Sequence, residues 1–308
     1  MRDALTAAAA RGPGALWAAL WPALRAYIAL TKPNIIWLLL VTTVPAMVLA
    51  AEGWPSTRLV VATLVGGMLA AGGANAINQY LDRDIDARMR RTQQRPLPTG
   101  AVAPLQAARF GLVLSALAGG WLVLTVNGLA ALLALGAIAF YVVVYTYWLK
   151  RSTWQNIVIG GAAGAAPALI GWAAVTGDLG SVVPFFMFVL VFWWTPPHFW
   201  ALALVLEEDY RAAGVPMLPV VRGADETRLQ ILVWSIAVAA LTLLFAPVAR
   251  LEWTYIVTAL VGGVGFVGLA ARLYFAPSTA RAMRLFRYST TYLGLLFLAM
   301  MVDVLLRA

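Results

Sequence analysis

Long stretches of uncharged, apolar residues recur along this chain and leave few folds open to it. They lie at roughly residues 34–51, 58–81, 106–125, 129–148, 155–176, 181–205, 228–248, 253–275 and 286–306. A helix needs about 20 apolar residues to cross the hydrocarbon core of a bilayer, and it satisfies its own backbone hydrogen bonds there. The sequence therefore predicts an all-α, multi-pass membrane protein built as a bundle of nine transmembrane helices.

The composition agrees with a membrane protein and excludes several kinds of site. Charged residues make up 11% of the 308 residues, whereas soluble chains carry about 25%. The chain has no cysteine and one histidine, which excludes disulfides, Cys-ligated zinc, iron–sulfur clusters and a multi-histidine metal site. In a membrane protein the net charge of +9 is a matter of how Lys and Arg are shared between loops, so we expect no nucleic-acid partner.

Lys and Arg fall mainly on one side of the predicted membrane. Of the 22, nineteen lie on the side of the N-terminus, and three, Arg58, Arg250 and Arg307, lie on the other. Cytoplasmic loops carry an excess of these residues. We therefore expect the N-terminus and all the long polar loops in the cytoplasm, with the protein in a bacterial inner (plasma) membrane. A mitochondrial source would place the same loops in the matrix.

The first residues differ in pattern from the apolar stretches that follow. Trp17, Leu20, Leu24 and Ile28 recur at helical spacing, with arginines among them. An amphipathic helix of this kind lies in the plane of the membrane surface. We expect residues 1–26 to form an interfacial lead-in and residues 27–308 to form a single transmembrane domain.

Three carboxylates and five arginines stand close together where the second apolar stretch ends. At about 100° per residue, a helix would place Asn78, Asp82 and Asp86 on one face, whereas Asp84 would face elsewhere or follow the end of the helix. Carboxylates this close repel one another unless a cation lies among them. Mg²⁺ takes oxygen ligands and commonly bridges carboxylates to a substrate phosphate. The spacing therefore predicts a magnesium site at the membrane surface.

Arginines follow the aspartates within the same loop. Arg90, Arg91 and Arg95 offer planar, bidentate donors that suit phosphate oxygens. Together with the carboxylates they indicate a metal-diphosphate site. The alternative is a solvated loop whose acids and bases only neutralise one another.

A second acidic cluster follows the sixth apolar stretch on the same predicted side, and it includes Asp209. Within that stretch, Pro196-Pro197 precedes His198. Prolines free backbone carbonyls that must be satisfied again or line a cavity, and an ionisable residue at such depth is by default a functional candidate. A histidine with a structural role is the alternative. The two acidic clusters would close over one substrate.

These residues resemble a known family. The pattern Asn78-x-x-x-Asp82-x-x-x-Asp86 resembles the first aspartate-rich motif of the UbiA superfamily of intramembrane prenyltransferases. The longer pattern is similar to one branch of it, whose members transfer a farnesyl group to heme. Further matching blocks, in an order that covers about residues 27–303, are Lys32-Pro33, Tyr145 to Lys150, Asn156 to Gly161 and on to Trp172, Pro196 to Leu202, Asp209 to Gly223, and Arg287 to Asp303.

The resemblance implies a central cavity that opens toward the cytoplasm and sideways to lipid. It also implies that Asn78, Asp82 and Asp86 hold Mg²⁺ and that Asp209 belongs to a second acidic, metal-binding motif. This sequence departs from the superfamily there, because Val205 stands four residues before Asp209 where the usual motif has an aspartate. Glu207 or Glu208 would have to substitute for it.

The same resemblance implies substrates and further site residues. Farnesyl diphosphate and heme B would be the substrates, and a heme A synthase or oxidase assembly factors would be possible contacts. Charge on the leaving diphosphate would fall to cationic side chains, and Tyr145 would face the developing carbocation. His198 would ligate or orient the heme or handle a proton, and Asn156 would contact substrate. The cationic candidates are Arg90, Arg91, Arg95, Lys150 and Arg222, of which Arg95 and Lys150 are the strongest.

Three other readings of the sequence stay open at this point. A UbiA-type enzyme acting on an aromatic quinone precursor would share the aspartate motif, but it has no evident use for His198. A transporter would place its charges near the middle of the membrane, whereas both acidic clusters here flank apolar stretches on one side. A scaffold protein would leave the spacing of the aspartates unexplained.

Overall fold

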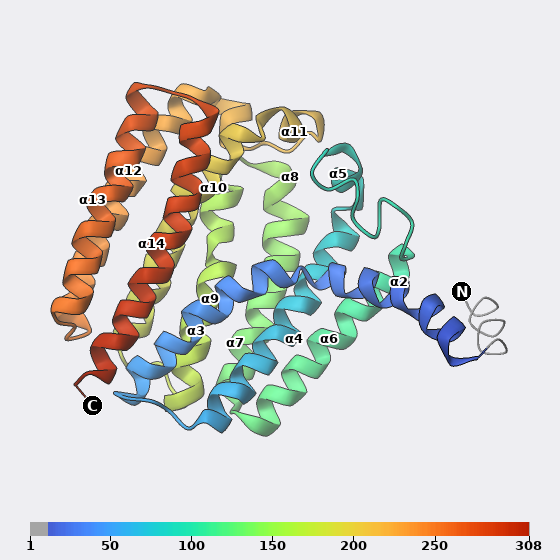
Figure 1. The fold of residues 1–308 in the computed structure, drawn as a ribbon, viewed down its shortest axis with the longest axis horizontal. Coiled ribbons are helices and arrows are strands. Elements are labelled where there is room, and N and C mark those ends of the chain that lie inside the picture. Colours follow the sequence, from blue (N-terminus) through green and yellow to red (C-terminus); the bar gives the residue numbers. More distant parts are fainter. Residues whose placement is uncertain (1–11, 308) are drawn as a thin grey trace.

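Helices make up all the regular structure of the described chain. The computed structural model describes residues 12–307, without the side chains of residues 13, 15–16, 18–19 and 34–40. In chain order the elements are α2 (Pro13–Thr31), α3 (Pro33–Ala51), α4 (Thr57–Leu81), α5 (Arg83–Arg88), α6 (Pro104–Thr125), α7 (Gly128–Ala139), the π-helix η1 (Phe140–Leu149), α8 (Lys150–Ser152), α9 (Asn156–Thr176), α10 (Val183–Val205), α11 (Glu207–Ala212), α12 (Leu218–Val248), α13 (Trp253–Phe275) and α14 (Thr279–Leu305). The long helices stand side by side as one bundle (Figure 1). The all-α prediction is confirmed for this range.

Eight helices of the described range are long and apolar enough to cross a membrane. They are Thr57–Leu81, Pro104–Thr125, Gly128–Ser152, Asn156–Thr176, Val183–Val205, Leu218–Val248, Trp253–Phe275 and Thr279–Leu305. The third of these combines α7, η1 and α8. Two spans begin earlier than expected, at Leu218 and Thr279, because polar residues before the apolar stretch are already helical. Gly223, with φ 84°, marks a kink inside the first of these two.

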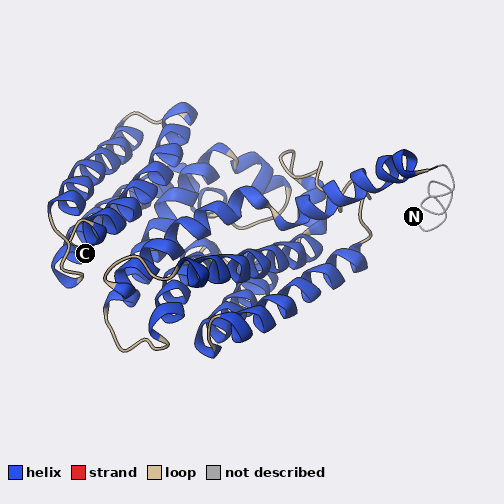
Figure 2. Ribbon diagram, turned by 60° about the horizontal axis from the view of Figure 1, so that its bottom comes forward, coloured by secondary structure: helices blue, strands red, loops and turns tan. Residues whose placement is uncertain are grey.

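The ninth expected span, residues 34–51, falls within α3. Of this helix the described side chains form a shorter apolar piece, Val41–Ala51, and the side chains of residues 34–40 lie outside the described ones. The ninth span therefore stays a prediction. Ahead of it, α2 runs unbroken past the expected boundary at residue 26, exposes Trp17 and Trp21, and extends beyond the bundle (Figure 2). Its place at a membrane surface also stays a prediction, and residues 1–11 of the lead-in lie outside the described range.

Two glycines let α4 and α6 cross closely. A Cβ atom added to Gly73 would lie 2.8 Å from the carbonyl oxygen of Gly111, and one added to Gly111 would lie 2.8 Å from that of Gly73. Small residues permit such backbone contact between helices in membranes. The crossing therefore fixes α4 against its neighbour a little more than one turn before Asn78.

Apolar side chains fill the bundle on both sides of α9. One cluster joins α10, α12, α13 and α14 around large residues such as Trp194, Phe245 and Phe297. A second joins α3, α4, α6 and α7 around Met47 and Leu122. Both clusters contribute to the walls of an internal cavity. Other large apolar side chains face outward and are exposed, as lipid-facing positions require.

One end of the bundle carries a small cap. There α5 and α11 lie above the long helices (Figure 1). A third apolar cluster holds the two short helices together, and it includes Ile85, Met89, Tyr210 and Met217. The cap therefore brings together two segments that are more than a hundred residues apart in the sequence.

Candidate active site

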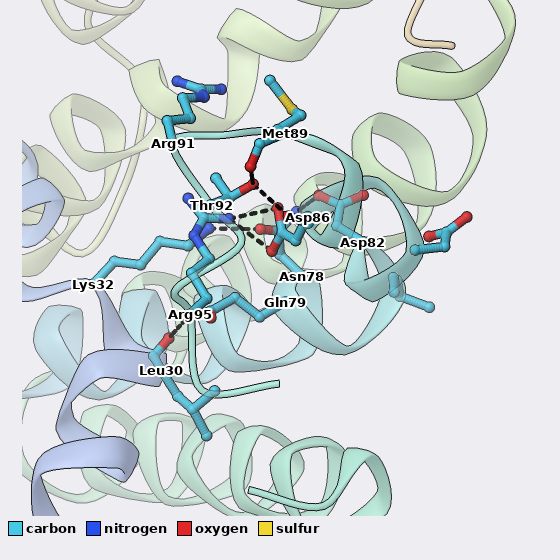
Figure 3. Close-up of polar contacts among 12 residues, drawn as sticks. Leu30, Lys32, Asn78, Gln79, Asp82, Asp86, Met89, Arg91, Thr92 and Arg95 are labelled. Carbon is cyan, nitrogen blue, oxygen red and sulfur yellow. Dashed lines mark hydrogen bonds and ion pairs between the residues drawn. The ribbon is translucent and has the colours of Figure 1, made fainter. Parts of the chain in front are cut away.

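The aspartate motif spans the junction between α4 and α5. Asp82 ends α4, and its N–H donates to the carbonyl of Asn78 at 2.9 Å, while the N–H of Asp86 donates to the carbonyl of Asp82 at 2.7 Å. The helical register therefore continues across the junction, and all three side chains are buried and gather in one place (Figure 3). Asp84 points elsewhere and is exposed, and its hydrogen bonds from Arg151 hold the pKa of the Asp84 carboxyl well below its usual range.

Each buried aspartate is paired with a cation. Lys150 donates to Oδ2 of Asp82, and Nη1 of Arg95 lies 2.8 Å from both carboxylate oxygens of Asp86. The hydroxyl of Thr92 donates to the carbonyl of Asp86 at 2.9 Å and holds the loop that returns Arg95 to the site. A solvated, self-neutralising loop would leave these groups in water, whereas the side chain of Asp82 is 1% exposed and that of Asp86 is 3% exposed.

Lys32 also belongs to the site, although the sequence did not identify it as a candidate catalytic residue. Its Nζ donates to Oδ1 of Asn78 at 2.6 Å (Figure 3). Burial of the ammonium group, together with nearby Arg95 and Lys150, lowers the pKa of Lys32 to about 7. Lys32 also joins α2 to α3 in the left-handed conformation, with φ 52°, which is costly for a residue with a side chain and typical of functional positions. A lone lysine before Pro33, at the edge of an apolar stretch, was the available signal.

The π-helix η1 lies beside the aspartate motif. In η1 the N–H of Lys150 reaches the carbonyl of Tyr145, five residues back, where an α-helix would reach four. The hydroxyl of Thr146 donates to the carbonyl of Tyr141 at 2.8 Å and accepts a hydrogen bond from Nδ2 of Asn78 at 3.0 Å. Such helices are rare and frequent at functional sites. This one directs Thr146 and Lys150 to the aspartate motif.

An apolar cavity of about 280 Å³ lies beside the charged site. Its walls are mostly alanine, glycine and other small apolar side chains from α4, α7, α9 and α10. Asn75, one helical turn before Asn78, lines it, as do Tyr141 and Tyr145, whose rings stack with centroids 5.5 Å apart. The cavity and the charged cluster therefore share α4 and η1 as walls.

The second acidic cluster lies across from the first. Nε of Arg90 is 2.9 Å from Oδ1 of Asp209, and Arg91 donates to the hydroxyl of Tyr210 at 2.9 Å. These bonds tie the loop after α5 to α11. Asp209 is buried, but Glu208 is exposed and Glu207 pairs with Arg211 on its own helix. Glu208 shares Arg90 with Asp209, at 3.3 Å from Nη2, so its part in the second acidic motif stays a prediction.

His198 is held between two aromatic rings inside the bundle. Its ring stacks on Trp194 at 4.2 Å and on Phe286 at 4.4 Å, and its Nδ1 is 2.7 Å from Oγ of Ser289. The Ser289 hydroxyl donates to the carbonyl of Phe286 at 2.8 Å, so it accepts from His198. This arrangement places a proton on Nδ1 and leaves Nε2 as the acceptor. Trp194 itself lines the cavity.

Two expected substrate contacts lie at the edge of the cap. Asn156 is buried, and its Nδ2 donates to the carbonyls of Thr153 at 2.6 Å and Pro216 at 3.4 Å, while its Oδ1 has no hydrogen-bond partner. The guanidinium of Arg222 lies 5.5 Å from the ring centroid of Trp154. Neither residue shares a hydrogen bond or ion pair with the aspartate motif in the described part of the chain.

The sequence of this chain matches one known protein family over most of its length. The sequence signature of the UbiA prenyltransferase family matches residues 39–300, which is most of the chain. The chain belongs to this family. It is therefore a membrane-embedded prenyltransferase, and the transporter and scaffold readings of its sequence are set aside.

Curated bacterial relatives of this UbiA family member carry one name. This chain is 52% identical over 285 residues to a protoheme IX farnesyltransferase of Clavibacter sepedonicus, and the match covers 92% of this chain and 93% of the relative. It is 53% identical over 290 residues to one of Symbiobacterium thermophilum, with 91% and 94% covered. A third, from Cutibacterium acnes, is 50% identical over 293 residues, with 91% and 85% covered.

Solved structures of other UbiA proteins share the fold. A UbiA homolog from Aeropyrum pernix superimposes with a TM-score of 0.74 at 21% identity, over 89% of this chain and 98% of that one. A homolog from Archaeoglobus fulgidus, bound to DMAPP and Mg²⁺, superimposes with a TM-score of 0.68 at 17% identity, over 89% and 99%. These likenesses support the UbiA-like helical architecture of this chain.

The residues of the aspartate motif fit a magnesium ion. Oδ1 of Asp82 is buried and has no hydrogen-bond partner, and Nη2 of Arg151 lies 3.9 Å from it. A buried carboxylate oxygen without a partner is costly, and a hard cation would satisfy it. In the described range no three acidic or histidine side chains group closely enough to hold a metal alone. The Asn78 amide would therefore have to complete the set with Asp82 and Asp86.

Proposed function

We propose that this chain converts heme B to heme O by transferring the farnesyl group of farnesyl diphosphate to a vinyl group of heme, with addition of water. The observation that carries the proposal is the placement of buried, cation-paired carboxylates one helical turn from an apolar cavity. Identity of about half to the protoheme IX farnesyltransferases supports heme, and not a quinone precursor, as the acceptor.

The reaction makes two electrostatic demands on the site. The bond between C1 of the farnesyl group and the diphosphate oxygen breaks, and the diphosphate leaves with the electron pair. The allylic carbocation then forms a carbon–carbon bond to the terminal vinyl carbon. The resulting cation beside the porphyrin takes the oxygen of a water molecule and releases a proton. Negative charge must therefore be stabilised at the leaving group, and water must be excluded until the first cation has reacted.

The charged cluster meets the first demand. Lys32, Lys150 and Arg95 converge on the aspartate motif, and each would turn from its carboxamide or carboxylate partner to a phosphate oxygen. Preorganised cationic donors of this kind stabilise charge as it develops on the leaving group. Mg²⁺ held by Asn78, Asp82 and Asp86 would supply further charge stabilisation on the diphosphate.

The apolar cavity meets the second demand. Its small side chains would admit the isoprenoid chain and keep water away from C1. The stacked rings of Tyr141 and Tyr145 line the cavity and belong to η1, the helix that also brings Thr146 to the aspartate motif. An aromatic face there would attract a carbocation. Tyr145 would therefore stabilise the farnesyl cation, as the sequence led us to expect.

The heme acceptor would approach from the side of His198. The ring of His198 is fixed by Trp194, Phe286 and Ser289, and its unprotonated Nε2 would orient the heme or accept the proton released by water. Arg222 and Asn156, at the edge of the cap, would contact the substrate from the aqueous side.

The cap would close the site on that aqueous side. Arg90 would hold Asp209 over the diphosphate, and Arg91 would reach a phosphate oxygen after release from Tyr210. Asp209 would serve the second acidic motif together with Glu208, which shares Arg90 with it, whereas Glu207 pairs with Arg211.

The end of the bundle that carries the cap would face the bacterial cytoplasm. Nineteen of the 22 Lys and Arg residues lie on the side of the N-terminus and of the polar loops that form the cap, and such residues concentrate in cytoplasmic loops. The protein would lie in the inner membrane, with both water-soluble groups, the diphosphate and the heme propionates, near the cytoplasmic surface.

Mass spectrometry of the heme product tests the proposed reaction. Purified protein is incubated with heme B, farnesyl diphosphate and Mg²⁺, and the extracted heme should gain the mass of a farnesyl group plus water. Unchanged heme, together with a prenylated product from a hydroxybenzoate, would assign the chain to the quinone branch instead.

A further inference from the structure

A second cavity, of about 500 Å³, opens at the turn between α13 and α14. Its walls come from the last two turns of α13 and the first two turns of α14. They are formed by Leu269, Ala271, Arg272, Phe275, Ala276, Arg281 and Arg284. The cavity therefore combines three guanidinium groups with apolar side chains.

The stretch of chain that forms this cavity carries no acidic residue. Between Glu252 and Asp303 the chain has no acidic residue. None of the ion pairs found in residues 12–307 includes the three cavity arginines. Arg281 donates from Nη1 to the carbonyl of Ala276 at 2.6 Å, which fixes its guanidinium at the turn and leaves its other donors available. All three arginines are exposed, so their free donors are accessible to an anion.

The position of the cavity determines which anions can reach it. The turn lies at the same end of the bundle as the cap, but on the opposite edge from α5 (Figure 1). It joins two helices that are each long enough to cross a membrane, so it lies where hydrocarbon meets the polar headgroups. Below the arginines, α13 presents outward apolar side chains such as Val261 and Val264, each 66% exposed.

We propose that this cavity binds the headgroup of an anionic phospholipid, whose acyl chains run down the outward face of α13. A guanidinium group matches the geometry of phosphate oxygens, and basic pockets between transmembrane helices bind anionic headgroups at the cytoplasmic surface. Phe275, 79% exposed at the rim, would contact the glycerol backbone and the upper acyl chain. The lipid site is separate from the aspartate motif and does not depend on the proposed reaction.

Lipid titration followed by native mass spectrometry tests the site on the purified, full-length protein. The probes are phosphatidylglycerol and the zwitterionic phosphatidylcholine, added at equal concentrations. The test variant is Arg272→Gln/Arg284→Gln, which leaves the contact of Arg281 with the turn intact. The matched control is Arg287→Gln, which removes an exposed arginine of α14 that does not line the cavity.

We expect wild type and Arg287→Gln to retain one phosphatidylglycerol at concentrations where phosphatidylcholine does not bind. Loss of two arginines near the membrane surface should weaken phosphatidylglycerol binding roughly tenfold or more in the double variant. The single variants Arg272→Gln and Arg284→Gln should each lose a few-fold, and they keep the test decisive if the double variant does not fold.

Three results would overturn the proposal. One is undiminished phosphatidylglycerol binding in the folded double or single variants, and another is equal binding of phosphatidylcholine to wild type. The third is displacement of the lipid by inorganic phosphate at the same concentration, which would mean that a free anion, and not a lipid, occupies the cavity.

Discussion

Arg95 donates from one guanidinium nitrogen to both carboxylate oxygens of Asp86, at 2.8 Å each. Lys150 donates to one carboxylate oxygen of Asp82, Oδ2. Before substrate binds, the site therefore balances its carboxylates with its own cations. A metal ion would need the same carboxylate oxygens, and a diphosphate would need the same cations. Binding of the metal would therefore free Arg95 and Lys150 for the diphosphate, and binding of the diphosphate would free the carboxylates for the metal.

Metal and diphosphate should consequently bind cooperatively. We expect Mn²⁺, a spectroscopic substitute for Mg²⁺, to bind weakly alone and roughly five- to 150-fold more tightly with an unreactive farnesyl thiodiphosphate, in keeping with typical coupling between sites. Electron paramagnetic resonance of free Mn²⁺ measures this directly. Equal affinity with and without the analogue would contradict the exchange of partners.

Asp82→Asn should fold and insert but lose nearly all turnover. The amide keeps the shape of the side chain but removes the negative charge. That charge pairs with Lys150 through Oδ2 and leaves the unpartnered Oδ1 available to a metal. We expect at least a hundredfold fall in heme O formation, similar to the loss of one key electrostatic group elsewhere. Asp84→Asn is the matched control, because Asp84 is exposed and its carboxylate binds neither Lys150 nor Arg95 in the described residues. Full activity in Asp82→Asn would refute the metal assignment.

Lys32→Met should raise the KM for farnesyl diphosphate. A charge-assisted hydrogen bond contributes about 1.5–3 kcal/mol, so the increase should be roughly tenfold to a hundredfold, with Lys32→Arg closer to wild type. The KM for heme should change little. An unchanged KM for the diphosphate in Lys32→Met would show that Lys32 serves only to position Asn78.

Gly160→Ala should damage the cavity wall. A Cβ atom there would lie 2.3 Å from Cδ2 of Tyr145, so the ring must leave its stacked position on Tyr141. Overpacking of this kind costs about 1–3 kcal/mol, and we expect a lower melting temperature with reduced turnover. Gly136→Ala is the control, since nothing lies within 4 Å of its added Cβ atom. Equal stability and turnover in the two variants would contradict the role given to the Tyr145 ring.

His198→Ala should abolish heme conversion while binding of the farnesyl thiodiphosphate survives. The variant removes the Nε2 acceptor but leaves the diphosphate site untouched. Ser289→Ala removes the hydroxyl that accepts from Nδ1 and should reduce heme conversion less. Heme titration by absorbance and calorimetry of the analogue separate the two effects. If both bindings and turnover stay at the wild-type level, His198 is a packing residue.

Much of the architecture could be predicted from patterns along the amino-acid sequence. Apolar length predicted six spans close to their observed bounds and the ends of two others, whose starts at Leu218 and Thr279 lie earlier than expected. Helical spacing brought Asn78, Asp82 and Asp86 to one place. These features follow from local geometry, since four residues make about one turn wherever a helix occurs. Arg95 was expected because it follows the aspartates in the same loop, whereas Lys150 was expected from the resemblance to the UbiA superfamily.

The remainder depends on contacts between distant segments. Lys32 reaches Asn78 because its backbone turns into the left-handed region, which no propensity of lysine would predict. The pairing of Arg90 with Asp209 requires two loops to meet above the bundle. The substitution of Glu207 or Glu208 in the second acidic motif stays a prediction: Glu207 pairs with Arg211, whereas Glu208 shares Arg90 with Asp209.

The π-helix makes the segment of residues 140–149 unusually sensitive to its own length. In it the N–H of Lys150 reaches the carbonyl of Tyr145, one residue further back than in an α-helix. Deleting one residue would let the segment relax to ordinary α-helical winding and would remove the wider turns that direct Thr146 and Lys150 to the aspartate motif. Substitutions in η1 should therefore be tolerated in evolution more readily than the deletion of a single residue.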